Sequence, residues 1–260
     1  MILIIVYNVS GKPIQTEDEE PIHSYGGMMR RYPLGLGNLA KMDEVYLHQI
    51  VDLIKLTVTS NSPIDVHVAN GFSIGNRTGE RCYLAYEESE YCNRLWCGRN
   101  RGFEMHVEQN DGREVMRCTR EFKCCAGCCW CADGDHCGWV MKVEAPRGHV
   151  IGYIRQHGSK WKTNITLYDV YNQELYDIWS KCCPFFCICC SDETNFHVND
   201  TKPGPPLKPR IYRKWDGCCT TADLLVCEFP GMEMEEKALF VCACFMIETM
   251  VFERLKWNSY

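Results

Sequence analysis

The fold is decided by one stretch near the C-terminus, Ala238-Leu239-Phe240-Val241-Cys242-Ala243-Cys244-Phe245-Met246-Ile247-Glu248-Thr249-Met250-Val251-Phe252. It is apolar nearly all round, so a helix formed here has to be covered on every side. About 15 residues span about 22 Å, whereas the hydrocarbon core of a bilayer is about 30 Å thick. The helix could therefore be covered by the interior of a β-barrel or by the acyl chains of a membrane. The helix is expected over about 235–253, and its core-facing or membrane-facing residues are Leu239, Phe240, Phe245, Met246, Ile247, Val251 and Phe252.

Upstream of this helix, from about residue 64 to residue 229, the sequence has the pattern of many short β-strands. One segment alternates apolar and polar residues from Phe103 to Gln109, turns at Asp111-Gly112 and resumes at Glu114. Many short strands separated by turn residues favour a sandwich or a closed barrel over a parallel sheet. The expected strands are Arg81–Tyr86, Phe103–Gln109, Glu114–Cys118, Trp139–Ala145, Val150–Gln156, Asn164–Tyr171, Phe196–Val198, Arg210–Trp215 and Leu224–Phe229.

The N-terminal part gives a weaker signal. Residues 1–40 are expected to be a short, partly irregular leader, and residues 41–260 to form one domain. Apolar residues between Met42 and Val58 recur at roughly helical spacing, with Asp43 in the first turn, and predict a helix there. Such a helix would be a solvated linker or a docking element for a partner or a membrane.

Charge and motif content narrow the classes of function. The 260 residues carry 28 Lys and Arg against 34 Asp and Glu, a net charge of −6, so nucleic acid is not an expected partner. The sequence contains no GxSxG, GxxxxGK[ST], HExxH or GxGxxG motif. We therefore expect a binding or transport protein rather than an enzyme.

Cysteine is the outlier in the composition, with 20 residues. Adjacent cysteines seldom pair with each other, and the apolar run Ile2–Val6 is too short for a signal peptide, so we expect a reducing compartment. Clustered thiols then have three possible uses. They can be acylated by palmitate, they can bind zinc with His136 and Cys137 as the remaining ligands, or they can pack as reduced side chains without a further role. Two cysteine clusters stand out. The first is the candidate lipidation site, Cys124, Cys125, Cys128, Cys129 and Cys131, and the second lies within residues 182–190. Arg117, Arg120 and Lys123 flank the first cluster and would favour anionic lipid.

Four segments, taken in order, resemble the phospholipid scramblase family. They are Leu36–Asp43, the run CCAGCCWC from Cys124 to Cys131, Val143–Tyr153 and Gly231–Glu253. The resemblance covers about residues 35–253. It implies a mainly β, tubby-like closed barrel of about 12 antiparallel strands around the hydrophobic C-terminal helix. It also implies palmitate on the first cysteine cluster, calcium as an activating ion, and phospholipids and a membrane as partners.

Two family features are altered or ambiguous in this chain. The family has an acidic, EF-hand-like loop before the terminal helix, which corresponds to residues 221–232. Only Asp223 and Glu228 are acidic there, so these two are the candidate calcium ligands of a degenerate site. A basic segment that serves some members as a nuclear import signal corresponds to Lys208–Trp215. Alternating charge on an exposed strand would give the same pattern.

Three functions follow as hypotheses. The leading one is a phospholipid scramblase at the cytoplasmic face of the plasma membrane, with the nucleus as a second location. It would move phospholipids in both directions without ATP, and either oligomerise or perturb the bilayer. The second is a palmitoylated binding or regulatory module without transport, and the third is a zinc-stabilised structural domain. A helix buried in the barrel would favour the second hypothesis, and a free apolar surface would favour membrane insertion.

Overall fold

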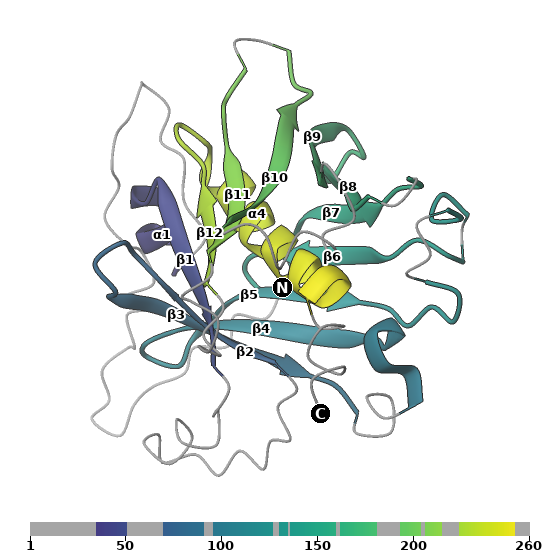
Figure 1. The fold of residues 1–260 in the computed structure, drawn as a ribbon. Helices are drawn as coiled ribbons and strands as arrows, with labels where there is room; N and C mark the ends of the chain where they lie inside the picture. The colour runs from purple at the N-terminus through teal and green to yellow at the C-terminus, as the bar shows by residue number, and fades with distance from the viewer. Residues whose placement is uncertain are drawn as a thin grey trace, which may run out of the picture.

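The computed structural model describes residues 35–50, 70–90, 96–126, 130–134, 136–159, 162–180, 193–203, 206–214 and 224–252. Their strands form one closed antiparallel barrel, shown in Figure 1, in which sequence neighbours pair and β1 closes the ring between β2 and β12. The expected fold class is thereby confirmed. The strands are β1 (Glu44–Gln49), β2 (Gly71–Gly75), β3 (Arg81–Glu88), β4 (Phe103–Gln109), β5 (Glu114–Arg120), β6 (Val140–Glu144), β7 (Val150–Gln156), β8 (Asn164–Tyr168), β9 (Glu174–Ser180), β10 (Glu193–Asp200), β11 (Arg210–Lys214) and β12 (Leu224–Glu228).

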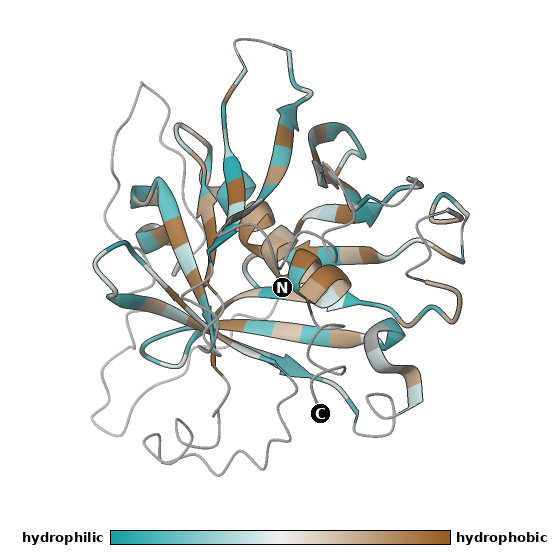
Figure 2. Ribbon diagram, in the orientation of Figure 1, coloured by the Kyte–Doolittle hydropathy of each residue, from teal (hydrophilic) through white to brown (hydrophobic). Residues whose placement is uncertain are grey.

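The strand predictions from the sequence are confirmed, with ends shifted by at most three residues. The turn at Asp111-Gly112 joins β4 to β5, with Gly112 at φ +83° and the Gln109 amide donating to the Arg113 carbonyl over 2.9 Å. Figure 2 shows hydrophilic and hydrophobic bands alternating along the strands. That alternation sends one set of side chains into the barrel and leaves the other set outside.

The prediction of a helix between Met42 and Val58 is wrong over residues 44–49, which form β1. Residues 51–58 lie outside the described residues. Val45 and Leu47 are buried and two positions apart, a spacing that a strand satisfies directly. Val45 stands opposite Cys227 of β12, and Leu47 stands opposite Ile74 of β2. Pairing with two distant strands therefore overrode a local pattern that fitted a helix.

Two further strands, β2 and β9, were not expected from the sequence. β2 begins and ends with glycine, which is rare in strands, although both glycines are buried here. β9 places Leu175 and Trp179 on its outer face, so its sequence does not alternate cleanly between apolar and polar. A short element, α1 (Gly37–Lys41), precedes β1 and buries Leu39 against the core.

The apolar C-terminal stretch forms α4 (Met234–Ile247), which continues as a π-helical turn, η2 (Glu248–Phe252), and runs through the barrel (Figure 1). No residue from Ala238 to Phe252 is more than 6% exposed. The structure therefore places Leu239, Phe240, Phe245, Met246, Ile247, Val251 and Phe252 in the barrel core. Among the described residues, no helix is both long and apolar enough to cross a membrane.

Aromatic contacts fit the helix to the barrel wall. Phe245 packs against Phe72 of β2 with ring centroids 5.3 Å apart, and Phe240 meets Tyr176 of β9 edge-on at 5.0 Å. On β7, Gly152 lets the backbone approach its neighbours, because a Cβ there would lie 2.2 Å from the carbonyl oxygen of Tyr168. Gly152 of the Val143–Tyr153 segment is thus a packing requirement.

Polar side chains tie both ends of the helix to the barrel. At the N-terminal end the Lys237 ammonium, 3% exposed, donates to the carbonyls of Ala40 (3.0 Å) and Met42 (2.5 Å). Burial lowers the Lys237 pKa, and Asp43, 3.6 Å away, partly offsets this. At the other end the Thr249 hydroxyl accepts a 3.0 Å bond from buried Arg120. Withdrawing the helix would break both sets of bonds as well as expose its apolar surface.

Sulfur atoms also join the helix to the wall. A disulfide links Cys118 of β5 to Cys242 of α4, with the Cα atoms 6.5 Å apart. Cys227 of β12 hydrogen-bonds Cys244 of α4, and burial raises the Cys227 pKa well above its usual value. None of these four residues belongs to the candidate lipidation cluster. The disulfide was not expected, because the sequence predicted a reducing compartment, and its two cysteines are 124 positions apart.

Candidate functional site

The first cysteine cluster lies on the loop between β5 and β6. Cys124, Cys125 and Cys131 are exposed, whereas Cys128 and Cys129 lie outside the described residues. Acylation and metal ligation both need accessible sulfur, so the location suits either use. The second cluster, residues 182–190, also lies outside the described residues.

The thiols of this loop interact with one another. The sulfurs of Cys124 and Cys125 are 3.5 Å apart, and the contact with Cys124, then desolvation, then Cys137 raise the Cys125 pKa. A raised pKa favours the protonated thiol, which is the weaker nucleophile. Cys137 approaches the cluster as the zinc hypothesis requires. However, the described residues contain no group of three or more His, Cys, Asp or Glu that could hold a metal ion.

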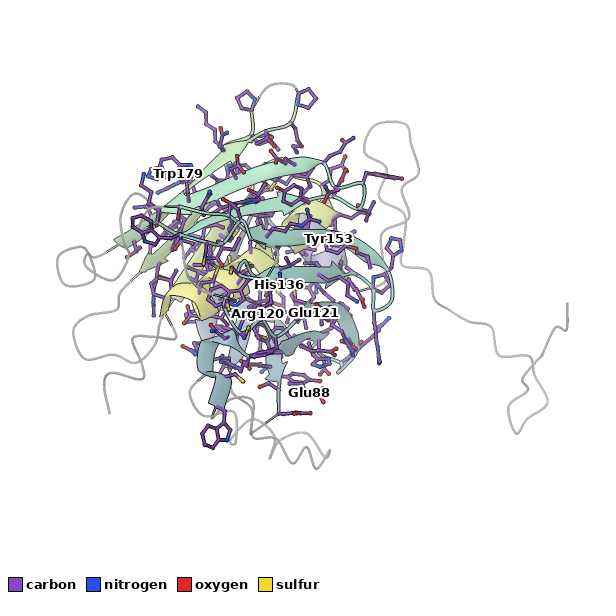
Figure 3. The ribbon with its side chains drawn as sticks, turned by 90° about the vertical axis from the view of Figure 1, so that its right-hand side faces the viewer. Glu88, Arg120, Glu121, His136, Tyr153 and Trp179 are labelled. Atoms are coloured by element: carbon purple, nitrogen blue, oxygen red, sulfur yellow. A yellow bond between two sulfur atoms is a disulfide. The ribbon has the colours of Figure 1, made fainter. Side chains whose placement is uncertain are left out.

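Large exposed aromatic residues accompany the cysteines. Trp96, Phe122 and Trp130 are 83%, 51% and 59% exposed, respectively. The Asn100 side-chain amide donates to the Cys124 carbonyl over 3.4 Å and ties the segment that carries Trp96 to the cysteine loop. Figure 3 labels Glu121 and His136 on the same β5–β6 connection. We call this surface the docking face and define it by Trp96, Phe122, Cys124, Cys125, Trp130 and Cys131.

The basic residues flanking the cluster do not lie as the sequence suggests. Arg117 forms ion pairs with Glu104 (2.9 Å) and Glu114 (2.7 Å), so its charge is compensated. Arg120 is 1% exposed, with its guanidinium 4.3 Å from the centre of the Phe103 ring. The expectation that Arg117 and Arg120 attract anionic lipid is therefore wrong, and Lys123 is partly exposed.

Of the two candidate calcium ligands, Glu228 lies within the described residues. Glu228 ends β12, accepts a hydrogen bond from the Tyr212 hydroxyl at 3.0 Å, and lies 3.6 Å from Arg210. Burial and the contact with Glu228 raise the Tyr212 pKa. Asp223 lies outside the described residues. Glu228 thus already has a hydroxyl donor and a cation beside it, and the calcium site stays a prediction.

The basic segment Lys208–Trp215 contributes to a barrel strand. Arg210 and Lys214 are exposed on β11, but Arg213 points into the barrel, where its guanidinium lies 3.7 Å from the centre of the Phe252 ring. Trp215 lies outside the described residues. The segment therefore has alternating charge on a strand and does not present all of its basic residues together.

Sequence reasoning missed a polar cleft on the outer face of β8, β9 and β10, with a volume of about 600 Å³. It follows from strand register: Trp179 stands opposite Asn164 and His197, and Asp177 stands opposite Thr166. The alternating outward residues of β9 carry the signal, but β9 was not recognised as a strand. We call this surface the polar cleft and define it by Asn164, Thr166, Glu174, Asp177, Trp179 and His197.

Comparison with known proteins gives a consistent answer. A model of the Scramblase family matches residues 23–254. Human phospholipid scramblase 2 is 30% identical over 229 residues, which cover 86% of this chain and 72% of that protein. Mouse phospholipid scramblase 1 is 30% identical over 227 residues, which cover 85% of this chain and 65% of that protein. Human phospholipid scramblase family member 5 is 28% identical over 226 residues, which cover 85% of this chain and 78% of that protein. No solved structure matches the chain significantly. With its family model matched over most of its length, this chain belongs to the phospholipid scramblase family.

Proposed function

We propose that this protein is a phospholipid scramblase that moves phospholipids across a bilayer in both directions without ATP. Membership of the family supports the activity. The single structural observation that carries the proposal is the docking face, which places exposed aromatic rings beside exposed thiols. Its proposed location is the cytoplasmic face of the plasma membrane, with the nucleus as a second location.

The docking face has the composition of a membrane anchor. Trp side chains prefer the interface between water and lipid, where an apolar ring and a polar N–H are both accommodated. Each buried methylene of an acyl chain contributes about 0.8 kcal/mol to membrane binding. Stable anchoring takes at least two membrane-binding signals, such as two acyl chains. Palmitate on several of Cys124, Cys125, Cys128, Cys129 and Cys131 would supply them. The barrel would then rest against the lipid surface on this side.

The buried helix restricts how lipids can cross. Because α4 fills the barrel and is tied at both ends, the proposed mechanism uses the docking face to disturb one leaflet. Local disorder lowers the cost of bringing a polar headgroup into hydrocarbon, and it does so equally for movement in either direction. An oligomer would enlarge the disturbed area. Calcium at Asp223 and Glu228 is part of the proposal as a regulator.

The test is a translocation assay in liposomes with fluorescent phospholipid on one leaflet, without nucleotide, with and without calcium. The acylated chain should accelerate movement from either leaflet. A variant with Ser at the five cysteines of the candidate lipidation site should lose both membrane association and activity. Glu80→Gln, on the exposed β2–β3 turn, is the control. Liposomes that carry bound protein but show no acceleration in either condition would refute the transport function.

The second candidate, a palmitoylated module without transport, is favoured by one specific observation, the burial of every residue of the helix from Ala238 to Phe252. It predicts flotation with liposomes and loss of flotation in the five-cysteine variant, but no lipid movement. The third candidate, a zinc-stabilised domain, predicts about one equivalent of zinc per chain. Metal analysis of the purified chain measures this directly.

A further inference from the structure

Two cysteines of α4 reach different walls of the barrel. Cys242 is joined by a disulfide to Cys118 of β5, and Cys244 contacts Cys227 of β12, both as thiols. Helix positions two apart point about 200° apart around the axis, so the two contacts lie on nearly opposite sides of the helix. The ring order agrees, because four strands separate β5 from β12 in one direction and six in the other. The helix is therefore held covalently on one side and by packed thiols on the other.

The disulfide is sealed inside the barrel. Cys118 and Cys242 are both fully buried, and the Sδ atom of buried Met116 lies 3.5 Å from the Cys242 sulfur. Thiol–disulfide exchange requires a thiolate to reach one of the two sulfurs. A reductant therefore has to wait until α4 moves away from β5. Burial explains how the bond can persist although the sequence predicts a reducing compartment.

The same bond opposes the movement that would expose it. It closes a loop between residues 124 positions apart. A cross-link over so long a loop restricts every state in which the helix has left the wall, and the restriction grows with loop length. The hydrogen bonds of Lys237 and Arg120 at the two ends of the helix do not involve sulfur. After reduction, these bonds and apolar packing alone would hold α4.

We propose that Cys118–Cys242 is a redox latch on the C-terminal helix, with a dithiol as its reducing partner. A thiolate of the dithiol attacks one sulfur, the bond between Cys118 and Cys242 breaks, and the released cysteine sulfur takes up a proton. The second thiol of the dithiol then displaces the remaining protein sulfur and closes a disulfide within the reductant. The two cysteines gain two electrons and two protons, and the dithiol is oxidised by the same amount. The latch sets how often the helix leaves the wall, which goes beyond the proposed lipid movement.

The experiment uses the unacylated full-length chain, purified without reductant, and Cys227 as the reporter. Iodoacetamide can reach this buried thiol only when α4 moves away from β12, so its labelling rate, followed by mass spectrometry, measures opening of the helix. Wild type that has been reduced with dithiothreitol in urea, refolded and freed of reductant should be labelled at Cys227 at least about tenfold faster than the oxidised chain. Exposed Cys131 is the internal control and should react at the same rate in both forms.

Two variants separate the latch from general loosening of the core. Cys118→Ala cannot form the bond, so treatment with reductant should not change its labelling rate at Cys227. Val143→Ala is the matched control, because buried Val143 of β6 stands directly opposite Cys118 and its truncation leaves the disulfide in place. Val143→Ala weakens packing, yet reduction should still accelerate its labelling about tenfold.

Sealing of the bond has its own measurement. Dithiothreitol should reduce the Cys118–Cys242 bond at least about a hundredfold more slowly in buffer than in concentrated urea, because in buffer the reaction waits for opening of the helix. Equal rates in the two solvents would contradict the sealed latch.

Three further outcomes would overturn the proposal. The first is a peptide map of the unreduced chain that shows free thiols at Cys118 and Cys242. The second is Cys227 labelling that reduction leaves unchanged in the wild type. The third is a reduced chain in which Cys227 reacts as fast as in urea, since the bond would then be required for folding and would not act as a switch. None of these measurements includes lipid, so the latch and the proposed lipid movement can fail independently.

Discussion

Replacing Phe240 with alanine tests whether the C-terminal helix is the core of the folded protein. Phe240 is fully buried and meets Tyr176 edge-on with ring centroids 5.0 Å apart. Removing a buried Phe ring costs about 3–5 kcal/mol, because apolar burial is lost and a cavity remains. Part of that loss is the aromatic pair itself, worth about 0.5–1.5 kcal/mol beyond its area. We therefore expect Phe240→Ala to lower the free energy of unfolding by about 4 kcal/mol.

The measurement is urea-induced unfolding of the unacylated chain in the absence of lipid, followed by far-ultraviolet circular dichroism. Trp96→Ala is the matched control, because Trp96 is 83% exposed and its removal should change the free energy by no more than about 0.5 kcal/mol. A helix that resided in a membrane would be dispensable to the barrel in water. A Phe240→Ala variant as stable as the Trp96→Ala variant would refute the placement of the helix in the barrel.

Two further predictions concern the barrel wall. Gly152→Ala should destabilise the fold by about 1–3 kcal/mol in the same urea assay, since its Cβ would lie 2.2 Å from the Tyr168 carbonyl oxygen; unchanged stability would contradict the close approach. Arg101→Met should cost about 3–5 kcal/mol at pH 7, because it leaves the Glu87 carboxylate buried without the guanidinium 2.6 Å away. Burial alone raises the Glu87 pKa, but hydrogen bonds and charge from Arg101 outweigh this and lower it. The pair therefore stabilises the fold fully above the unfolded pKa of about 4.3 and loses its effect as pH falls through the lower folded value, so the difference between wild type and Arg101→Met should shrink in acid. A difference that is constant from pH 7 to pH 3 would contradict this assignment.

The buried arginines were not predictable from the sequence. In the sequence, Arg120 flanks the first cysteine cluster, and Arg213 belongs to the basic segment Lys208–Trp215. Neither position indicates a buried side chain. Both point into the barrel near the C-terminal end of the helix, where Arg120 meets Phe103 and Arg213 meets Phe252. Aromatic faces and helix-end carbonyls favour a guanidinium in this place. Only the position of the helix end inside the barrel makes these two sites suitable for a buried charge.

The candidate site was predictable in part. The cysteine run and its neighbours Trp130 and Phe122 are continuous or nearly so in the sequence, and the structure exposes Cys124, Cys125 and Cys131. Trp96 joins them only through the packing of two separate loops. The polar cleft draws on three strands, so no single segment contains its pattern.

By itself, the sequence determined that the chain forms short antiparallel strands and one helix that must be covered on every side. Both features depend on local sequence. Side-chain periodicity and turn residues determine where the strands lie, and a helix that is apolar on every side has to be shielded from water. Tertiary structure decided which apolar surroundings the helix takes, that β1 is a strand, and which charges face inward. These outcomes depend on closure of the ring through β1, β2 and β12, which brings residues about 180 positions apart into register, and no local pattern contains that pairing.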